Sequence, residues 1–144
     1  GSCKNKLVKC NNTREPGGRQ IRTTHHDLGS EAGKVEIMYN MNTLPDKLEV
    51  FYNGKRVVST FDVRGNNKGF VGGQNAGCCG ILCFDYNPAS GDRFCTIKVT
   101  GGQDPTTKWE YEIRCPIKGK CNYKAKVISC SSIPLTPNNP ENCP

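Results

Sequence analysis

The sequence predicts an all-β domain built as an antiparallel two-sheet β-sandwich, jelly-roll-like or Ig-like, with seven or eight strands and disulfide reinforcement. Three observations carry this prediction. Several runs alternate apolar and polar side chains with a period of two, the pattern of a half-buried antiparallel strand. Turn residues separate these runs at intervals of roughly 8 to 15 residues. Ten cysteines in 144 residues exceed ordinary cytosolic usage and indicate stapling disulfides.

The length is that of one domain, with less regular segments at both ends. Residues 1–18 are expected to be irregular, because Glu15-Pro16-Gly17-Gly18 has the composition of a turn. The tail 131–144 carries four prolines and is expected to be extended and irregular. The sandwich is expected over residues 19–130, with strands at 19–28, 34–39, 47–52, 55–61, 81–86, 93–100, 108–115 and 121–130.

Two turn signals fix the order of the central strands. Pro45 has no amide hydrogen, so Pro45-Asp46 is expected at a corner. Asn53-Gly54 between β-rich runs predicts a type I′ hairpin, because both residues tolerate positive φ. In the strand that follows, the alternation places Val57, Ser59 and Phe61 on one face. Residues 64–80 are rich in glycine and form a long loop, which is either functional or held by disulfides.

The cysteines are expected to pair as disulfides in an oxidising, extracellular compartment. Five bridges fit an even count of ten, although spacing alone leaves their connectivity open. Cys95 and Cys115 both fall on apolar strand faces, which makes a buried bridge between them the first expectation. Zinc ligation is less favoured, because no second C-x₂-C-type pair is present. The expected disulfide cysteines are Cys3, Cys10, Cys78, Cys79, Cys83, Cys95, Cys115, Cys121, Cys130 and Cys143.

Other features agree with secretion. Asn11-Asn12-Thr13 is an N-glycosylation sequon at Asn11. No apolar run approaches the roughly 18 residues of a membrane span. The formal net charge of +7 favours an anionic partner, with plain solubility as the alternative. Nucleic acid is not the favoured partner, because it needs a basic stripe interleaved with aromatic residues. Only a weak version of such a stripe is present, at Lys118, Lys120, Lys124 and Lys126.

Short motifs resemble a family of small β-sandwich accessory modules found in secreted, often bacterial, multidomain proteins. The resemblance spans about Asp27–Pro116 and is one of pattern. It implies a ligand-binding or structural module and brings no catalytic activity with it. The motifs are Asp27-Leu28-Gly29, Gly33-Lys34-Val35, Tyr39-Asn40-Met41, Leu44-Pro45-Asp46, Val50-Phe51-Tyr52-Asn53-Gly54-Lys55, Val99-Thr100-Gly101 and Trp109-Glu110-Tyr111.

The long loop holds the favoured ligand site. A sugar ring stacks on a flat aromatic side chain while amides and cations supply hydrogen bonds. Phe51, Phe70 and Phe94 fall off the main apolar faces or in the loop, although rings of this kind also pack beneath loops. The predicted glycan-binding residues are Asn66, Asn67, Lys68, Phe70 and Gln74.

Two further groups of residues are weaker candidates for a functional site. Asp27, Asp46 and Asp62 lie near turns and could bind Ca²⁺ at one end of the sandwich, although turn-forming aspartate is the simpler explanation. His25 and His26 could serve a secreted, toxin-like hydrolase, but adjacent strand residues point to opposite faces.

The functional prediction is therefore a secreted, non-catalytic binding or adhesion module. It would recognise a glycan or a cell-surface protein through loops at one end of the sandwich, and the positive net charge favours an anionic one. The alternative is a structural or assembly domain of a larger secreted protein.

Overall fold

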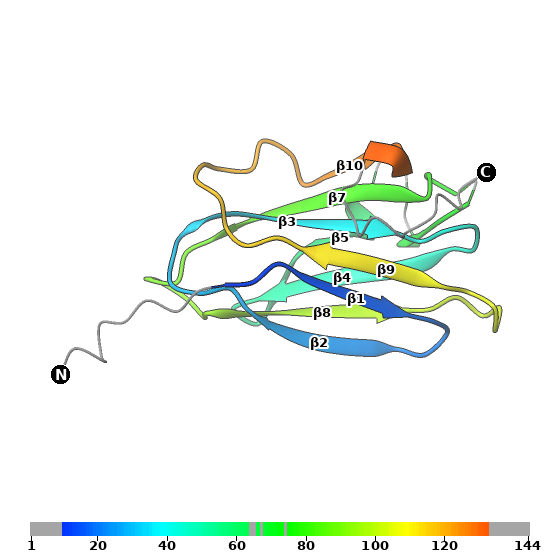
Figure 1. Cartoon of the computed structure of the whole chain (residues 1–144), viewed down its shortest axis with the longest axis horizontal. Helices are drawn as coiled ribbons and strands as arrows, with labels where there is room; N and C mark the ends of the chain where they lie inside the picture. Colours follow the sequence, from blue (N-terminus) through cyan, green and yellow to red (C-terminus); the bar gives the residue numbers. More distant parts are fainter. Residues whose placement is uncertain (1–9, 64–65, 67, 74, 133–144) are drawn as a thin grey trace.

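A computed structural model describes residues 10–63, 66, 68–73 and 75–132. This part of the chain forms ten β-strands in two antiparallel five-stranded sheets. Figure 1 shows how the two sheets pack together. The all-β prediction is confirmed, but the expected count of seven or eight strands is wrong. The additional strands are β1 at the N-terminal side and the short β6 inside the long loop.

Sheet A and sheet B divide the strands as follows. Sheet A has the order β1 (Thr13–Gly17), β9 (Trp109–Ile113), β3 (Gly33–Asn40), β7 (Cys79–Tyr86) and β10 (Ala125–Ile128). Sheet B has the order β2 (Arg22–Asp27), β8 (Phe94–Thr100), β4 (Asp46–Tyr52) and β5 (Lys55–Ser59), and β6 (Phe70–Val71) also pairs with β4. Two 3₁₀ turns, η2 (Thr60–Asp62) and η3 (Cys130–Ser132), complete the regular structure of the described residues.

The core lies between the sheets and follows the period-two pattern of the sequence. On β4 every second residue is buried, and on β8 the buried side chains alternate with half-buried ones. Trp109 and Tyr111 stack on each other from β9, with ring centroids 5.9 Å apart. The other large fully buried side chains are Tyr39, Tyr86, Leu28, Ile37, Met41, Leu48, Leu82, Ile97, Val35 and Val50.

The predicted hairpin is confirmed at Asn53-Gly54. Both residues have positive φ, 53° and 76°, as a type I′ turn requires. The Asn53 side chain also accepts a hydrogen bond from the Asp92 amide at 2.6 Å, so this turn anchors the neighbouring loop.

The expectation for residues 1–18 is wrong over Thr13–Gly17, which form β1 and pair with β9 from Thr13↔Ile113 to Gly17↔Trp109. Pro16 and Gly17 have the composition of a turn, yet they belong to β1, which is an edge strand. An edge strand tolerates proline because one side of its backbone needs no ladder partner. The structure describes nothing of residues 1–9, and the predicted tail lies outside the described residues beyond 132.

The predicted face of Val57, Ser59 and Phe61 is also wrong. The register between β4 and β5 shifts between Val50 and Phe51, so that Val58 is the buried partner of Val50. After Ser59 the chain leaves the sheet and enters η2, which contains Phe61. A bulge of this kind inserts one residue and reverses the alternation that follows it.

Three disulfides join pairs of described cysteines, all of them attached to sheet A or the segments that flank it. They are Cys10–Cys115, Cys79–Cys130 and Cys83–Cys121. Cys78 is disulfide-bonded as well. The segment between Cys115 and Cys130 runs from the end of β9 to the outer edge of sheet A and is tied to β7 at both Cys83 and Cys79.

The expected Cys95–Cys115 bridge is wrong. Cys95 is a free, buried thiol, and Cys115 pairs with Cys10. Cys95 faces the core from the middle of sheet B, whereas Cys115 lies beyond the end of β9 in sheet A. An expectation that all ten cysteines are bridged therefore fails at Cys95.

Candidate binding surface

Aromatic rings and cations meet on the outer face of sheet B, at the end where β6 joins β4. Lys47 Nζ lies 5.6 Å from the centroid of Phe61 and 5.3 Å from that of Phe70, and Arg56 Cζ lies 4.5 Å from Phe61. Arg56 also donates a 3.0 Å hydrogen bond to Glu49. These five residues are called the aromatic–cation corner below. Contacts of this kind between cations and ring faces are worth roughly 0.5–1 kcal/mol each at exposed sites.

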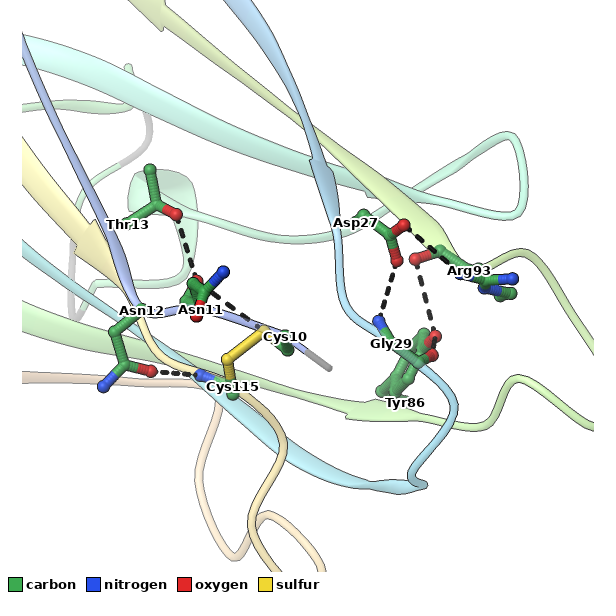
Figure 2. Close-up of a disulfide and its surroundings, with 9 residues drawn as sticks. All are labelled: Cys10, Asn11, Asn12, Thr13, Asp27, Gly29, Tyr86, Arg93 and Cys115. Atoms are coloured by element: carbon green, nitrogen blue, oxygen red, sulfur yellow. Dashed lines mark hydrogen bonds and ion pairs between the residues drawn. A yellow bond between two sulfur atoms is a disulfide. The ribbon is translucent and has the colours of Figure 1, made fainter. Parts of the chain in front are cut away.

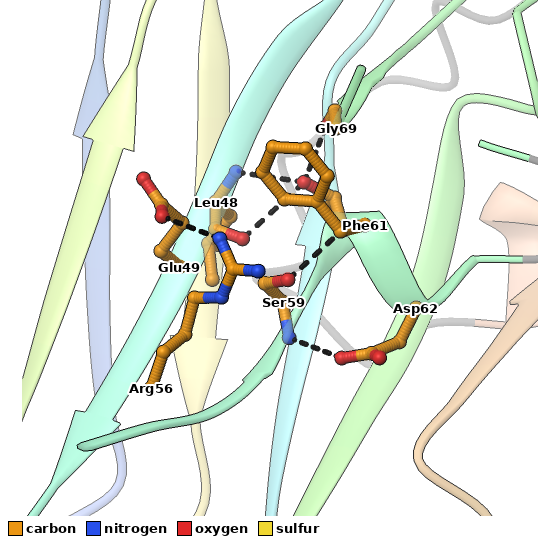
Figure 3. Close-up of polar contacts among 8 residues, drawn as sticks. Leu48, Glu49, Arg56, Ser59, Phe61, Asp62 and Gly69 are labelled. Atoms are coloured by element: carbon orange, nitrogen blue, oxygen red, sulfur yellow. Dashed lines mark hydrogen bonds and ion pairs between the residues drawn. The ribbon is translucent and has the colours of Figure 1, made fainter. Parts of the chain in front are cut away.

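A single threonine closes the sheet behind this corner, where Figure 3 shows Leu48 and Gly69 beside Phe61. Along one side of β4, β5 pairs with Glu49–Tyr52 and β6 with Asp46 and Lys47, which leaves Leu48 between them without a strand partner. Thr60 fills the gap. Its hydroxyl accepts the Leu48 amide at 3.0 Å and lies within hydrogen-bond distance of the Leu48 and Gly69 carbonyls.

The loop that carries Phe70 is held by the side chain of Asn66. The amide nitrogen of Asn66 donates to the carbonyls of Phe70 at 2.9 Å and Thr60 at 3.4 Å. Its carbonyl oxygen accepts the Gly69 amide at 3.0 Å. Gly69, at φ 82°, lies against Phe61, and a Cβ there would come within 2.6 Å of the ring. The loop backbone is therefore fixed close against the corner.

The predicted glycan residues lie partly within this corner. Phe70 is half-buried over Lys47, and Lys68 is exposed beside it. Asn66 stabilises the loop with its own hydrogen bonds, and Asn67 and Gln74 lie outside the described residues. Lys47, Arg56 and Phe61 were not among the predicted residues, because only the β4–β6 pairing and the bulge in β5 bring them together.

The rest of the outer face of sheet B continues away from the corner. The register places Phe51 beside both Thr96 and Arg56, and Glu49 beside Lys98. His25 Nδ1 lies 2.8 Å from the Thr96 hydroxyl on the same face. At the far end of β8, Phe94 is 54% exposed and is among the most exposed large apolar side chains of the described residues.

The histidine pair is divided between two environments, as strand alternation predicts. His25 is exposed on the outer face, while His26 is buried and its Nε2 lies 2.8 Å from the Tyr111 hydroxyl. Burial lowers the pKa of His26, and the Glu15 carboxylate partly opposes that effect. The structure does not bring the two imidazoles to one site.

A small polar cavity lies beside His26, between edge strands β1 and β2. Its volume is about 290 Å³. Glu15 faces the opening and pairs with Arg22 at 2.7 Å, so its charge is compensated. The lining residues are Cys10, Asn11, Thr13, Glu15, Thr24, His25, His26, Asp27, Leu28 and Ile113.

The three predicted metal ligands are dispersed. Asp27 accepts the Gly29 amide at 2.9 Å and pairs with Arg93 at 3.3 Å, as Figure 2 shows. Asp62 caps η2 by accepting the Ser59 amide at 2.8 Å. Within residues 10–63, 66, 68–73 and 75–132, no group of three or more His, Cys, Asp or Glu side chains is placed to hold a metal ion.

Asp46 is fully buried, unlike the other two aspartates. One carboxylate oxygen accepts the Thr107 hydroxyl at 2.7 Å and the Gly102 amide at 3.0 Å. The other carboxylate oxygen is buried without a hydrogen-bond partner. Burial raises the pKa of Asp46 to about 6, against the effect of these two hydrogen bonds. The residue thus ties the loop after β8 to the start of β4.

Asn11 and Thr13 of the sequon line the polar cavity, and Figure 2 shows them near the Cys10–Cys115 disulfide. Asn11 is exposed, and the Thr13 hydroxyl donates to its backbone carbonyl at 3.0 Å. Asn12 accepts the Cys115 amide at 2.8 Å next to the Cys10–Cys115 bridge. The Asn11 side chain is therefore accessible in the folded protein.

No helix among the described residues has the length and apolar character needed to cross a membrane. Comparison with family models, with curated proteins and with solved structures gave no match to this chain.

Proposed function

We propose that this protein is a secreted binding module that recognises a glycan through the aromatic–cation corner. The observation that carries the proposal is the position of Lys47 between Phe61 and Phe70, with Arg56 on Phe61. Half-buried rings of this kind keep part of their apolar surface exposed for contact with a sugar ring, and the cations beside them can donate hydrogen bonds to hydroxyl or acidic groups.

The corner is preorganised, which favours binding over simple packing. Thr60 and Asn66 hold both ring-bearing segments by hydrogen bonds to the backbone. A surface that is already ordered loses little conformational entropy when it binds a ligand. Phe61, Phe70 and Lys47 remain only partly buried despite this network.

The fold supports a jelly-roll form of the sandwich. The order β1-β9-β3-β7 in one sheet faces β2-β8-β4-β5 in the other, so strands β1 to β4 alternate between the sheets. Two interleaved Greek keys of eight strands have this arrangement, and lectin domains are among the proteins that use it. We place the protein outside the cell on the basis of its disulfides, and Asn11 as a glycosylation site on its exposure.

A glycan array with the wild-type protein and Phe70→Ala tests the proposal. Specific binding is expected for the wild type and a loss of about fivefold or more for the variant, since stacking on an aromatic side chain is worth roughly 1–3 kcal/mol. Ile117→Ala is the matched control, because Ile117 is 48% exposed but lies on the segment after β9. An array without hits, or equal loss in both variants, would rule out the corner as a glycan site.

A structural or assembly role is the second candidate. The observation that favours it is the disulfide-bound segment over sheet A, which joins both ends of the described chain to one sheet. A negative array together with unimpaired folding of Phe70→Ala would favour this role.

A further inference from the structure

We infer that the ligand of this surface is an acidic polysaccharide, bound along the outer face of sheet B from the aromatic–cation corner to Phe94. The inference rests on the proposed function and specifies its ligand class. It draws on a part of the surface that the corner itself does not include, namely Phe51 of β4 and the outward side chains of β8.

The register places these side chains in three successive rows across the two strands. Lys47 faces Thr100, Glu49 faces Lys98 and Phe51 faces Thr96. Phe70 continues the first row and Arg56 the third. Threonine hydroxyls and half-buried rings thus alternate with charged groups over the whole face, which suits a ligand that carries both sugar rings and ionised groups.

The surface is longer than one sugar ring. From Thr100 in the first row to Phe94 at the far end, β8 runs six residues, or roughly 20 Å at a strand rise of 3.3 Å per residue. Aromatic rings lie at both ends of this distance, with Phe70 and Phe61 at one end and Phe94 at the other. A ligand that uses both ends must be a chain rather than a monosaccharide.

The charge of the face is positive. Lys47, Lys98 and Arg56 project outward from β4, β8 and β5, and Glu49 is the one carboxylate of these strands that faces outward with them, since Asp46 is buried. Glu49 already accepts a hydrogen bond from Arg56, so the four residues keep a net charge of +2 from Lys47 and Lys98. Carboxylate or sulfate groups along a polysaccharide would complement it.

The outer face of sheet A differs and provides an internal comparison. It carries acidic groups on every central strand, namely Glu36 on β3, Asp85 on β7, and Glu110 and Glu112 on β9. Arg14 binds Glu110 and Arg114 binds Glu112, and the Tyr123 hydroxyl donates to Glu36 at 2.7 Å. On β3, β7 and β9 these four carboxylates stand against a single cation, Lys34, so the central strands of sheet A carry the opposite charge to β4, β8 and β5 of sheet B.

Dextran and dextran sulfate form a matched pair of probes, because they share a backbone and differ in charge. The protein is expected to bind dextran sulfate at least tenfold more tightly than dextran, and this preference should shrink as salt rises from about 50 to 300 mM, since salt screens exposed charges. Isothermal titration calorimetry or biolayer interferometry measures both affinities.

Lys98→Gln isolates the charge contribution, because Lys98 is outside the corner. We expect it to weaken dextran sulfate binding by about two- to fivefold, the effect of one exposed ion pair, and to leave dextran binding unchanged. Lys118→Gln is the control, since Lys118 is exposed on the segment after β9. Equal weakening by both variants would show that only net charge matters and would overturn the inference.

The remaining outcomes separate the inference from the proposed function. Equal affinity for both dextrans, or array hits restricted to neutral glycans, would overturn the acidic ligand while the glycan-binding role stands. Absence of binding to every glycan would remove both. Single-stranded DNA of matched charge serves as a third probe, and tighter binding to it through Lys98 would replace the polysaccharide with a nucleic acid.

Discussion

His26 Nε2 lies 2.8 Å from the Tyr111 hydroxyl, a hydrogen bond that joins edge strand β2 of sheet B to β9 of sheet A. Burial lowers the pKa of His26 from its ordinary value of 6.5, so the folded state takes up the proton less readily than the unfolded state. The stability that His26 contributes is therefore complete above pH 6.5 and is lost as the pH falls below it. Urea unfolding between pH 7.5 and 5.5 should show this decline.

The variant His26→Gln separates this effect from other titrating groups. Its free energy of unfolding should depend less on pH over the same range, whatever its absolute value. His25→Gln is the control and should keep most of the wild-type slope, because His25 is the smallest of the three influences on the pKa of His26. If the free energy of unfolding of His26→Gln depended on pH as strongly as that of the wild type, titration of His26 would not be the cause of the decline.

Asp46 should affect stability in the opposite direction. Its folded-state pKa of about 6 exceeds the ordinary value of 3.8, so the folded state binds this proton more tightly. Its contribution to stability should rise as the pH falls from above 6 towards 3.8. In Asp46→Asn this rise should be absent, which urea unfolding of both proteins at each pH measures. An identical pH profile in the variant would mean that Asp46 titrates normally.

Thr60→Val should destabilise the fold by roughly 1–3 kcal/mol, because it leaves the buried Leu48 amide without an acceptor. It should also weaken glycan binding, since the Gly69 carbonyl loses its partner beside Phe61. Thr60→Ser keeps the hydroxyl and is expected to retain most of the stability. Equal losses in the two variants, measured by denaturant unfolding, would show that the methyl group rather than the hydroxyl matters.

Gly17→Ala should destabilise the protein by roughly 1–3 kcal/mol, the usual cost of overpacking. A Cβ at this position would overlap the Trp109 ring, which is held by stacking on Tyr111 and by a 2.8 Å hydrogen bond to the Gly18 carbonyl. Gly18→Ala is the neighbouring control, because its Cβ would meet only the Thr107 carbonyl at 3.5 Å. The thermal unfolding midpoint of Gly17→Ala should lie several degrees below that of Gly18→Ala. Equal midpoints would contradict the close packing of Gly17 against Trp109.

Cys95 should resist alkylation in the folded protein. Burial raises the pKa of its thiol to about 12, and the thiolate is the reactive form. Treatment with iodoacetamide at pH 8, followed by peptide mass mapping, should find Cys95 unmodified in native protein and modified after unfolding without reductant. Modification of native Cys95, or its recovery in a disulfide-linked peptide, would contradict a buried free thiol.

The regular strands could be predicted because apolar and polar side chains alternate along them, and this alternation shows which face of the strand is buried. The strand Asp46–Tyr52 and the Asn53-Gly54 turn follow directly from that local pattern. Edge strand β1 could not be predicted in the same way, since Pro16 and Gly17 carry turn chemistry and only the pairing with β9 makes them a strand.

The candidate surface was predictable only in part. Phe70 was identified as an aromatic residue in a long loop, but its neighbours Lys47 and Phe61 depend on pairing between segments far apart in sequence. The disulfide pairs were likewise beyond prediction. Cys95 and Cys115 both follow the apolar alternation, yet the strands that carry them belong to different sheets, and no spacing rule encodes that separation.

The pattern of disulfides determines how the domain would carry a mechanical load. Tension between Cys10 and Cys130 would pass from Cys10 to Cys115, along the chain to Cys121, across to Cys83, and through β7 to Cys79 and Cys130. Every strand of sheet B lies outside this covalent route. The face that carries the rings and cations would therefore stay folded and able to hold its ligand while the sheet behind it transmits the force.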